Sequence, residues 1–315
     1  MMTSPVKRLT EFVLAAQQGV ISKPLPILSQ GELGELERAI NLLVEEFKKT
    51  RQEKEEQSVN DELMEKEMRM AQAIQSSLLP SKIPEIPDLN IEAFYQPARE
   101  IGGDYYDFIE IDPVHMGIVV ADVSGKSISA AMFMSIARST LRSQALLTLS
   151  PSEVLERTQD LLMPSLRPGF FVSIFYSILD LETKKMVCAN AGHLPLMVYR
   201  SSQKQSEWIH PKGIAMGLIR TRTAGTRLFE EEEFTLEEGD LAFFYTDGLT
   251  ETRDSQGVFF GRDRLADFFM DACQKKIPDY LLHLRENLDQ FAGSVPQQDD
   301  RTAIVIQRKS EVFHA

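Results

Sequence analysis

Carboxylates placed at the ends of predicted strands are the residues of this sequence with the clearest chemical potential. Near-continuous apolar runs, which are typical of buried strands, end or begin at acidic residues in three places: Asp122, Asp247 and the pair Asp299-Asp300. Asp104 is a fourth candidate, because Gly102-Gly103 directly before it allows a kink or bulge that would aim its side chain. One such aspartate is commonly a turn former, but four are more than turns usually need.

If these strands converge, four carboxylates gather in one place and repel one another unless cations neutralise them. Oxygen ligands without nearby histidine or cysteine suit Mg²⁺ or Mn²⁺ and not zinc. Two such cations about 3.5–4 Å apart would bridge a water molecule and lower its pKa. A two-metal site that activates water is therefore the hypothesis that these carboxylates favour.

Bulk composition excludes several classes of protein. The 315 residues are 43% hydrophobic and 26% charged, as in an ordinary globular protein. A net charge of −13 argues against nucleic acid or an anionic membrane surface as the main partner. Cys188 and Cys273 fit neither a metal site nor a disulfide framework, and no apolar run is long enough to span a membrane. We therefore expect a cytoplasmic protein, or the cytoplasmic part of a membrane-anchored receptor whose membrane segment is not in this chain.

The N-terminal region has the heptad pattern of helices that pack against partner helices. Apolar residues step by three and four positions within 6–20 and within 33–47. The second pattern continues through a polar middle to Met64, Met68, Ala71, Gln75 and Leu78, and Pro80 ends it. Packing inside a monomeric bundle is the alternative. Two short helices with narrow apolar stripes bury little apolar surface alone, however, so we expect a homodimer.

These helices resemble a HAMP domain. "PVKRLTEFVLAAQQG" is similar to the first HAMP helix and "GELGELERAINLLVEEF" to the second. The resemblance implies a HAMP-like signalling domain over 1–55, followed by a coiled-coil linker helix over 56–79.

The remaining chain, 80–315, resembles the metal-dependent PPM-type (protein phosphatase 2C-like) serine/threonine phosphatases. The motifs that carry the resemblance occur in order: "IGGDYYDF", "VADVSGKS", "NAGHLP", "MGL", "EEGDLAFFYTDGLTE", "FGRDRL" and "QDDRT". Within that family the sequence is similar to the bacterial branch related to the sporulation stage II E phosphatase and the phosphatases that regulate sigma factors.

The resemblance implies a fold and a set of metal ligands. The fold is α+β: two antiparallel sheets packed face to face with helices outside, an αββα sandwich. Helical patterns at about 128–146, 151–163, 262–274 and 278–292 are compatible with it. The implied ligands are Asp104, Asp122, the carbonyl of Val123, Asp247, Asp299 and, less directly, Asp300.

Two further residues are open to two interpretations each. Arg99 lies five residues before Asp104 and is our candidate for binding the substrate phosphate; the alternative is a solvated arginine beside Glu100. His193, in "NAGHLP", is either a general acid or a turn histidine that holds a strand end.

The resulting hypothesis is a Mn²⁺- or Mg²⁺-dependent phosphoserine/phosphothreonine phosphatase controlled by the N-terminal dimer. The branch resemblance implies a STAS-type anti-sigma-factor antagonist as its phosphoprotein substrate. One alternative is a HAMP-linked diguanylate cyclase, although Tyr105-Tyr106 replaces the Glu-Phe that its Gly-Gly-Asp signature needs. The other is a catalytically inactive signalling module, which the presence of all four aspartates disfavours.

Overall fold

The structure is a computed structural model, and it describes most of the chain from residue 64 onward. The described residues are 12, 24–28, 34, 37–38, 41–42, 45, 49, 64–125, 128–166, 169–219, 227–275 and 277–310. The chain divides into two compact units, Met1–Met68 and Arg69–Ala315. Most of the predicted HAMP-like region, and residues 56–63 of the predicted linker, lie outside the described residues.

In the first unit, side chains hold a segment without regular secondary structure, residues 24–28, in place. The amide of Asn41 bonds both backbone groups of Leu25: its Oδ1 accepts from the Leu25 N–H at 2.8 Å, and its Nδ2 donates to the Leu25 carbonyl at 2.9 Å. The carboxylate of Glu37 accepts from the Leu28 N–H at 2.9 Å. The segment 24–28 is therefore tied to residues whose backbone is helical.

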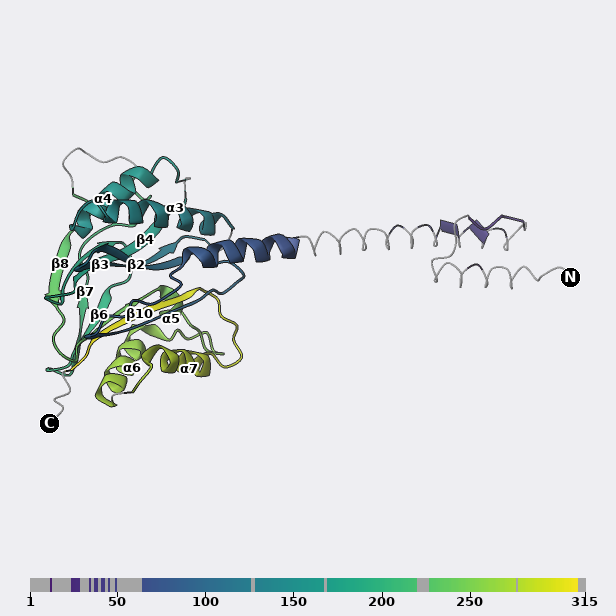
Figure 1. The fold of residues 1–315 in the computed structure, drawn as a ribbon. Coiled ribbons are helices and arrows are strands. Elements are labelled where there is room, and N and C mark those ends of the chain that lie inside the picture. The colour runs from purple at the N-terminus through teal and green to yellow at the C-terminus, as the bar shows by residue number, and fades with distance from the viewer. Residues whose placement is uncertain are drawn as a thin grey trace. The chain divides into compact units, whose positions relative to one another are not determined.

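The second unit is built on two five-stranded antiparallel sheets (Figure 1). The first sheet has the order β1-β10-β9-β6-β7. Its strands are β1 (Leu89–Gln96), β10 (Arg301–Arg308), β9 (Leu241–Tyr245), β6 (Leu196–Arg200) and β7 (Gln205–Ile209). The second sheet has the order β2-β3-β4-β5-β8. Its strands are β2 (Asp104–Asp112), β3 (His115–Val123), β4 (Val172–Asp180), β5 (Lys185–Ala191) and β8 (Glu231–Thr235).

Helices cover the outer face of each sheet. α3 (Ile128–Ala145) and α4 (Pro151–Leu162) pack on the β2–β8 sheet, and α6 (Gly261–Lys275) and α7 (Tyr280–Ala292) pack on the β1–β7 sheet (Figure 1). The short helix α5 (Asp247–Thr250) follows β9. These layers confirm the predicted αββα sandwich and the four predicted helices.

Three apolar clusters explain why the central strands are apolar throughout. One lies between the sheets and includes Ile118, Phe175 and Phe244; the other two lie between each sheet and its helices. A strand such as β9 is therefore buried on both faces, and all five of its residues are buried.

Residues 64–78 are helical and lead into the second unit. The compact unit that begins at Arg69 includes part of the predicted linker. Within the part of the chain that the structure describes, no helix has the length and apolar character needed to cross a bilayer.

Candidate metal centre

The β2–β8 sheet contributes two of the predicted acidic residues. Asp104 is the first residue of β2, and Asp122 is the penultimate residue of β3. The antiparallel register of these strands places the two residues directly opposite each other. Residues opposite in an antiparallel pair have their Cβ atoms about 4.5–5.5 Å apart, so the carboxylates are neighbours on one sheet.

The β1–β7 sheet contributes a second acidic group. Asp247 begins α5 directly after β9, and Asp299 precedes β10. Asp247, Asp299 and Glu251 each offer a carboxylate oxygen, and these oxygens lie within 4.8 Å of one another. The helical turn at α5 brings Glu251 to the same side as Asp247, because residues four apart on a helix are neighbours. Three oxygen donors at this spacing can hold a hard divalent cation.

Two threonine hydroxyls connect the acidic groups of the two sheets. Thr246, next to Asp247, donates from Oγ1 to Asp104 Oδ2 at 2.7 Å, and Thr302 Oγ1 donates to the same oxygen at 2.5 Å. The two threonines also bond each other: Thr246 N–H donates to the Thr302 carbonyl, and Thr302 N–H donates to the side-chain Oγ1 of Thr246. One oxygen of Asp104 is thus committed to protein donors, and the other remains available as a ligand.

Gly102 and Gly103 allow the backbone to approach these groups closely. A Cβ on Gly103 would lie 2.6 Å from the carbonyl oxygen of Val123 and 3.4 Å from Asp122 Oδ1. A Cβ on Gly102 would lie 2.4 Å from Asp300 Oδ2. Side chains at either position would therefore fill the space around the Val123 carbonyl and the carboxylates. This close approach explains why two glycines precede Asp104.

The carboxylate of Asp300 accepts hydrogen bonds from backbone N–H groups. Its Oδ1 accepts a hydrogen bond from the Ala98 N–H at 2.8 Å, and its Oδ2 accepts from the Gly103 N–H at 2.6 Å. The Asp104 N–H points to the same Oδ2 at 3.4 Å. Both oxygens accept hydrogen bonds from backbone donors, so Asp300 holds the turn at Gly102-Gly103. Its role as a metal ligand stays a prediction.

Burial and mutual repulsion make this cluster electrostatically unfavourable without a counter-charge. Asp104 is 2% exposed. Burial raises the pKa of its carboxyl well above the ordinary value, and the neighbouring Asp122 and Asp300 raise that pKa further. The available donors are carboxylate and carbonyl oxygens, which are the donors that Mg²⁺ and Mn²⁺ prefer. The residues present therefore fit a divalent cation site.

The raised pKa of Asp104 predicts how the metal-free protein responds to pH. Between the ordinary carboxyl pKa of 3.8 and the raised pKa, the folded protein holds a proton that the unfolded chain has released. The free energy of unfolding of the metal-free protein should therefore fall as pH rises through this window. Asp104→Asn should flatten this dependence and raise metal-free stability at pH 7 by about 0.5–2 kcal/mol.

Urea denaturation in EDTA between pH 5 and pH 8 checks this prediction. The matched control is Asp267→Asn, which changes an exposed aspartate of α6. A variant at position 104 that keeps the wild-type pH dependence would show that this carboxyl does not carry the effect.

The sequence allowed two roles for His193, and its contacts fit the structural one. Its Nε2 lies 3.1 Å from the Tyr245 carbonyl oxygen, and its Nδ1 lies 2.8 Å from Ser173 Oγ. Because a carbonyl only accepts, Nε2 carries the proton and Nδ1 accepts from the serine hydroxyl. Burial lowers the pKa of His193 to about 4, so the ring is neutral at physiological pH. The ring joins Ser173, which is paired with Asp122, to the strand that leads to Asp247.

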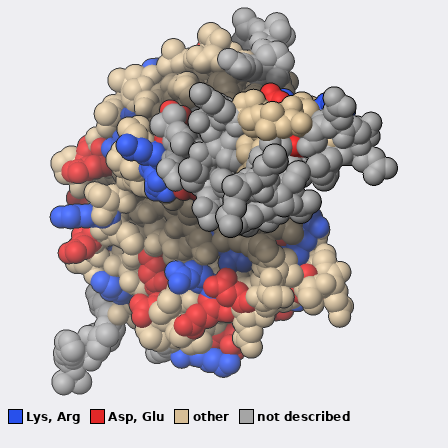
Figure 2. Space-filling view, turned by 90° about the vertical axis from the view of Figure 1, so that its right-hand side faces the viewer, with Lys and Arg blue, Asp and Glu red and all other residues tan. Residues whose placement is uncertain are grey.

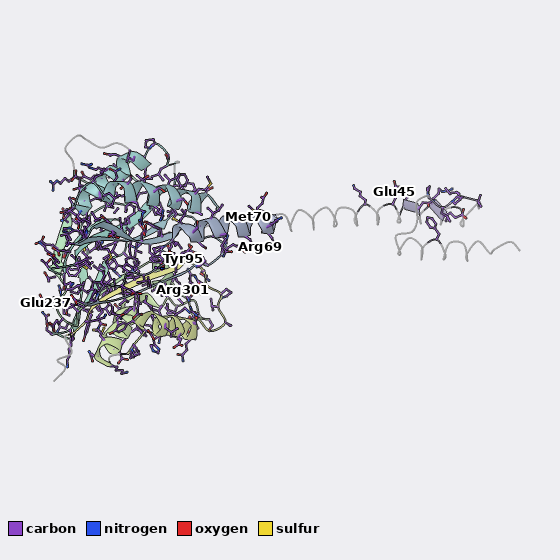
Figure 3. The ribbon with its side chains drawn as sticks, in the orientation of Figure 1. Glu45, Arg69, Met70, Tyr95, Glu237 and Arg301 are labelled. Atoms are coloured by element: carbon purple, nitrogen blue, oxygen red, sulfur yellow. The ribbon has the colours of Figure 1, made fainter. Side chains whose placement is uncertain are left out.

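Three residues near the site were not anticipated from the sequence. The sequence did contain a signal for Glu251: it lies four residues after Asp247, which the sequence places at the end of a strand. Thr246 and Thr302 had none, because their bonds to Asp104 cross 142 and 198 residues of sequence. Figure 3 labels two residues beside Thr302: Arg301 precedes it in β10, and Tyr95 of β1 is its partner in the sheet register.

Arg99 lies exposed in the bend at 98–101. Its phosphate-binding role stays a prediction. On the face shown in Figure 2, acidic and basic side chains are interspersed, and the residues that the structure describes form no continuous basic surface there.

Comparisons with known proteins agree with this geometry. The family model described as Stage II sporulation protein E (SpoIIE) matches residues 112–309. The phosphoserine phosphatase RsbU of Bacillus subtilis is 26% identical over 305 residues, which cover 95% of this chain and 87% of RsbU.

Two solved structures show the same fold. The SiaA-PP2C domain of Pseudomonas aeruginosa has a TM-score of 0.69 at 20% identity, and the match covers 79% of this chain and 98% of that domain. A crystal structure of RsbX in complex with magnesium has a TM-score of 0.52 at 15% identity, with 72% of this chain and 98% of RsbX covered.

Proposed function

This chain belongs to the SpoIIE family of PP2C-type phosphatases, and from that premise we propose that it removes phosphate from phosphoserine or phosphothreonine of a regulatory protein. The observation that carries the proposal is the set of carboxylates at strand ends of the two sheets. Asp104 lies opposite Asp122 and accepts a hydrogen bond from Thr246, the residue before Asp247. Carboxylate oxygens of Asp247, Glu251 and Asp299 lie within 4.8 Å of one another. The phosphoserine phosphatase RsbU, similar over nearly the whole chain, supports the same activity.

We propose that two divalent cations, Mn²⁺ or Mg²⁺, are held by Asp104, Asp122, Asp247, Asp299 and the Val123 carbonyl, with Glu251 as an additional carboxylate. When bound, the cations would supply Lewis acidity that lowers the pKa of water and neutralises charge on the phosphoryl oxygens. The magnesium in the RsbX structure supports this choice of metal.

The protein's own residues would orient this chemistry. Thr246 and Thr302 fix one oxygen of Asp104 and would thereby leave the other to bind a cation. The close approach of Gly103 leaves the Val123 carbonyl free to face the same space. His193 joins the two sheets as a neutral ring, so the proposed mechanism does not use it as an acid.

The proposed substrate is a phosphorylated STAS-type anti-sigma-factor antagonist, and the proposed control is an N-terminal HAMP and coiled-coil dimer. The family membership supports the first. The heptad pattern and the bonds that tie segment 24–28 to Asn41 and Glu37 support the second. A cytoplasmic location is proposed because both cysteines are free.

The test is phosphate release from purified phospho-STAS proteins by the full chain, with Mn²⁺, with Mg²⁺ and with EDTA. We expect release only with a divalent cation, together with hydrolysis of p-nitrophenyl phosphate. A parallel incubation with GTP and Mg²⁺ should yield no cyclic dinucleotide; its formation would favour the cyclase. Failure to hydrolyse any phosphoester would favour a catalytically inactive module.

A further inference from the structure

The side-chain amide of Gln75 holds both backbone groups of Gly102. Gln75 Nε2 donates to the Gly102 carbonyl at 2.6 Å, and Gln75 Oε1 accepts from the Gly102 N–H at 3.1 Å. Gln75 is 5% exposed, and Gly102 is buried. Two hydrogen bonds to one residue fix both the position and the orientation of its flanking peptides.

Gly102 is the start of a continuous series of contacts that ends at the candidate metal ligands. The next residue, Gly103, donates its N–H to Asp300 Oδ2 and accepts from the Val123 N–H at 3.3 Å. Asp104 follows immediately. A displacement of Gly102 would therefore move the Asp104 carboxylate and change the distance to the Val123 carbonyl.

Gln75 belongs to a helical segment that is otherwise poorly buried. Among the described residues 64–78, it is the only buried side chain. By contrast, Met64, Met70 and Ile74 are 60–64% exposed, and Figure 3 labels Met70 on this segment. The polar residue in the predicted apolar seam thus contacts the phosphatase unit of its own chain.

We infer that Gln75 is a positioning residue, and that it couples the seating of the 64–78 helix to the affinity of the metal centre. The inference rests on the proposed function for the identity of that centre. If the helix shifts, the amide no longer holds Gly102, and the ligands on either side of the glycine turn lose their geometry. Residues that orient metal ligands typically contribute about 10- to 100-fold to metal affinity or activity.

Two variants and a matched control test this role in the full chain. Gln75→Leu removes both hydrogen bonds at nearly constant side-chain volume. Gln75→Asn keeps the amide group on a side chain that is one methylene shorter, so the amide cannot reach Gly102 in the same way. The control is Gln72→Leu, which makes the same change at an exposed glutamine one turn earlier. Isothermal titration of metal-free protein with MnCl₂ measures affinity, and hydrogen exchange of the metal-free protein measures the protection of the 102–104 amides.

We expect both Gln75 variants to bind Mn²⁺ about 10-fold more weakly, with faster exchange at 102–104, while Gln72→Leu matches wild type. A merely structural role would lower the free energy of unfolding without a selective change at these amides or in Mn²⁺ affinity, and that result would overturn the inference. If wild type binds no Mn²⁺, the proposed function fails, whereas the exchange data still decide whether Gln75 holds the turn.

Discussion

Asp122→Asn and Asp247→Asn should each reduce the kcat for Mn²⁺-dependent hydrolysis of p-nitrophenyl phosphate by at least about 10²–10³-fold. Each change removes one negative charge and one oxygen donor from a centre whose other donors are fixed by the two sheets. Because the two residues come from different sheets, each variant damages a different half of the centre. The loss should exceed the 10- to 100-fold effect typical of residues that only support a ligand.

The measurement is a steady-state assay over a range of MnCl₂ concentrations, with the free energy of unfolding determined in parallel. Asp267→Asn is again the control, since it makes the same chemical change on an exposed part of α6. Folded Asp122→Asn and Asp247→Asn proteins that retain wild-type kcat would contradict the assignment of the carboxylate cluster as the catalytic centre.

Gly103→Ala should damage the centre strongly, because the added methyl group would meet backbone atoms beside the candidate ligands. Its Cβ would lie 2.6 Å from the Val123 carbonyl oxygen and 3.2 Å from that of Gly125. Both are backbone atoms, so the turn before Asp104 must move. A displacement of about 1 Å at a catalytic group can lower the rate by about 10²-fold, and we expect a loss of that order with weaker Mn²⁺ binding.

Gly257→Ala provides the comparison, because an added Cβ there meets no atom within 4 Å. Its positive φ of 81° predicts a loss of stability of about 1–2 kcal/mol without a change in kcat. If the two alanine variants have equal kcat and equal Mn²⁺ affinity, then close backbone approach at Gly103 is not required for activity.

Much of the fold could be predicted from local patterns. The continuous apolar runs of β3, β9 and β10 indicated strands covered on both faces, and the aspartates at their ends indicated where chemistry could occur. The helices α3, α4, α6 and α7 follow from apolar periodicity, and Ser150 with Pro151 marks the start of α4 as a capping residue and a first-turn proline.

The remaining features depend on contacts between distant parts of the chain. The sequence could not show that Asp300 accepts hydrogen bonds from the N–H groups of Ala98 and Gly103, because these residues lie far from it along the chain. Likewise, Gln75 fits an apolar helix stripe as a polar exception, and only its bonds to Gly102 show what it contacts. Periodicity identifies which face of an element is apolar but not which backbone group lies opposite.

The hydrogen bond between Gly103 and Asp300 joins residues 197 positions apart. During synthesis, a ribosome has therefore made nearly all of the catalytic domain before the glycine turn can acquire its acceptor. Premature termination before Asp299 would remove Asp299, Asp300 and Thr302, and with them part of the acidic centre and one of the two threonines that bond Asp104. A truncated polypeptide of this kind should therefore lack a complete centre, however well its earlier strands form.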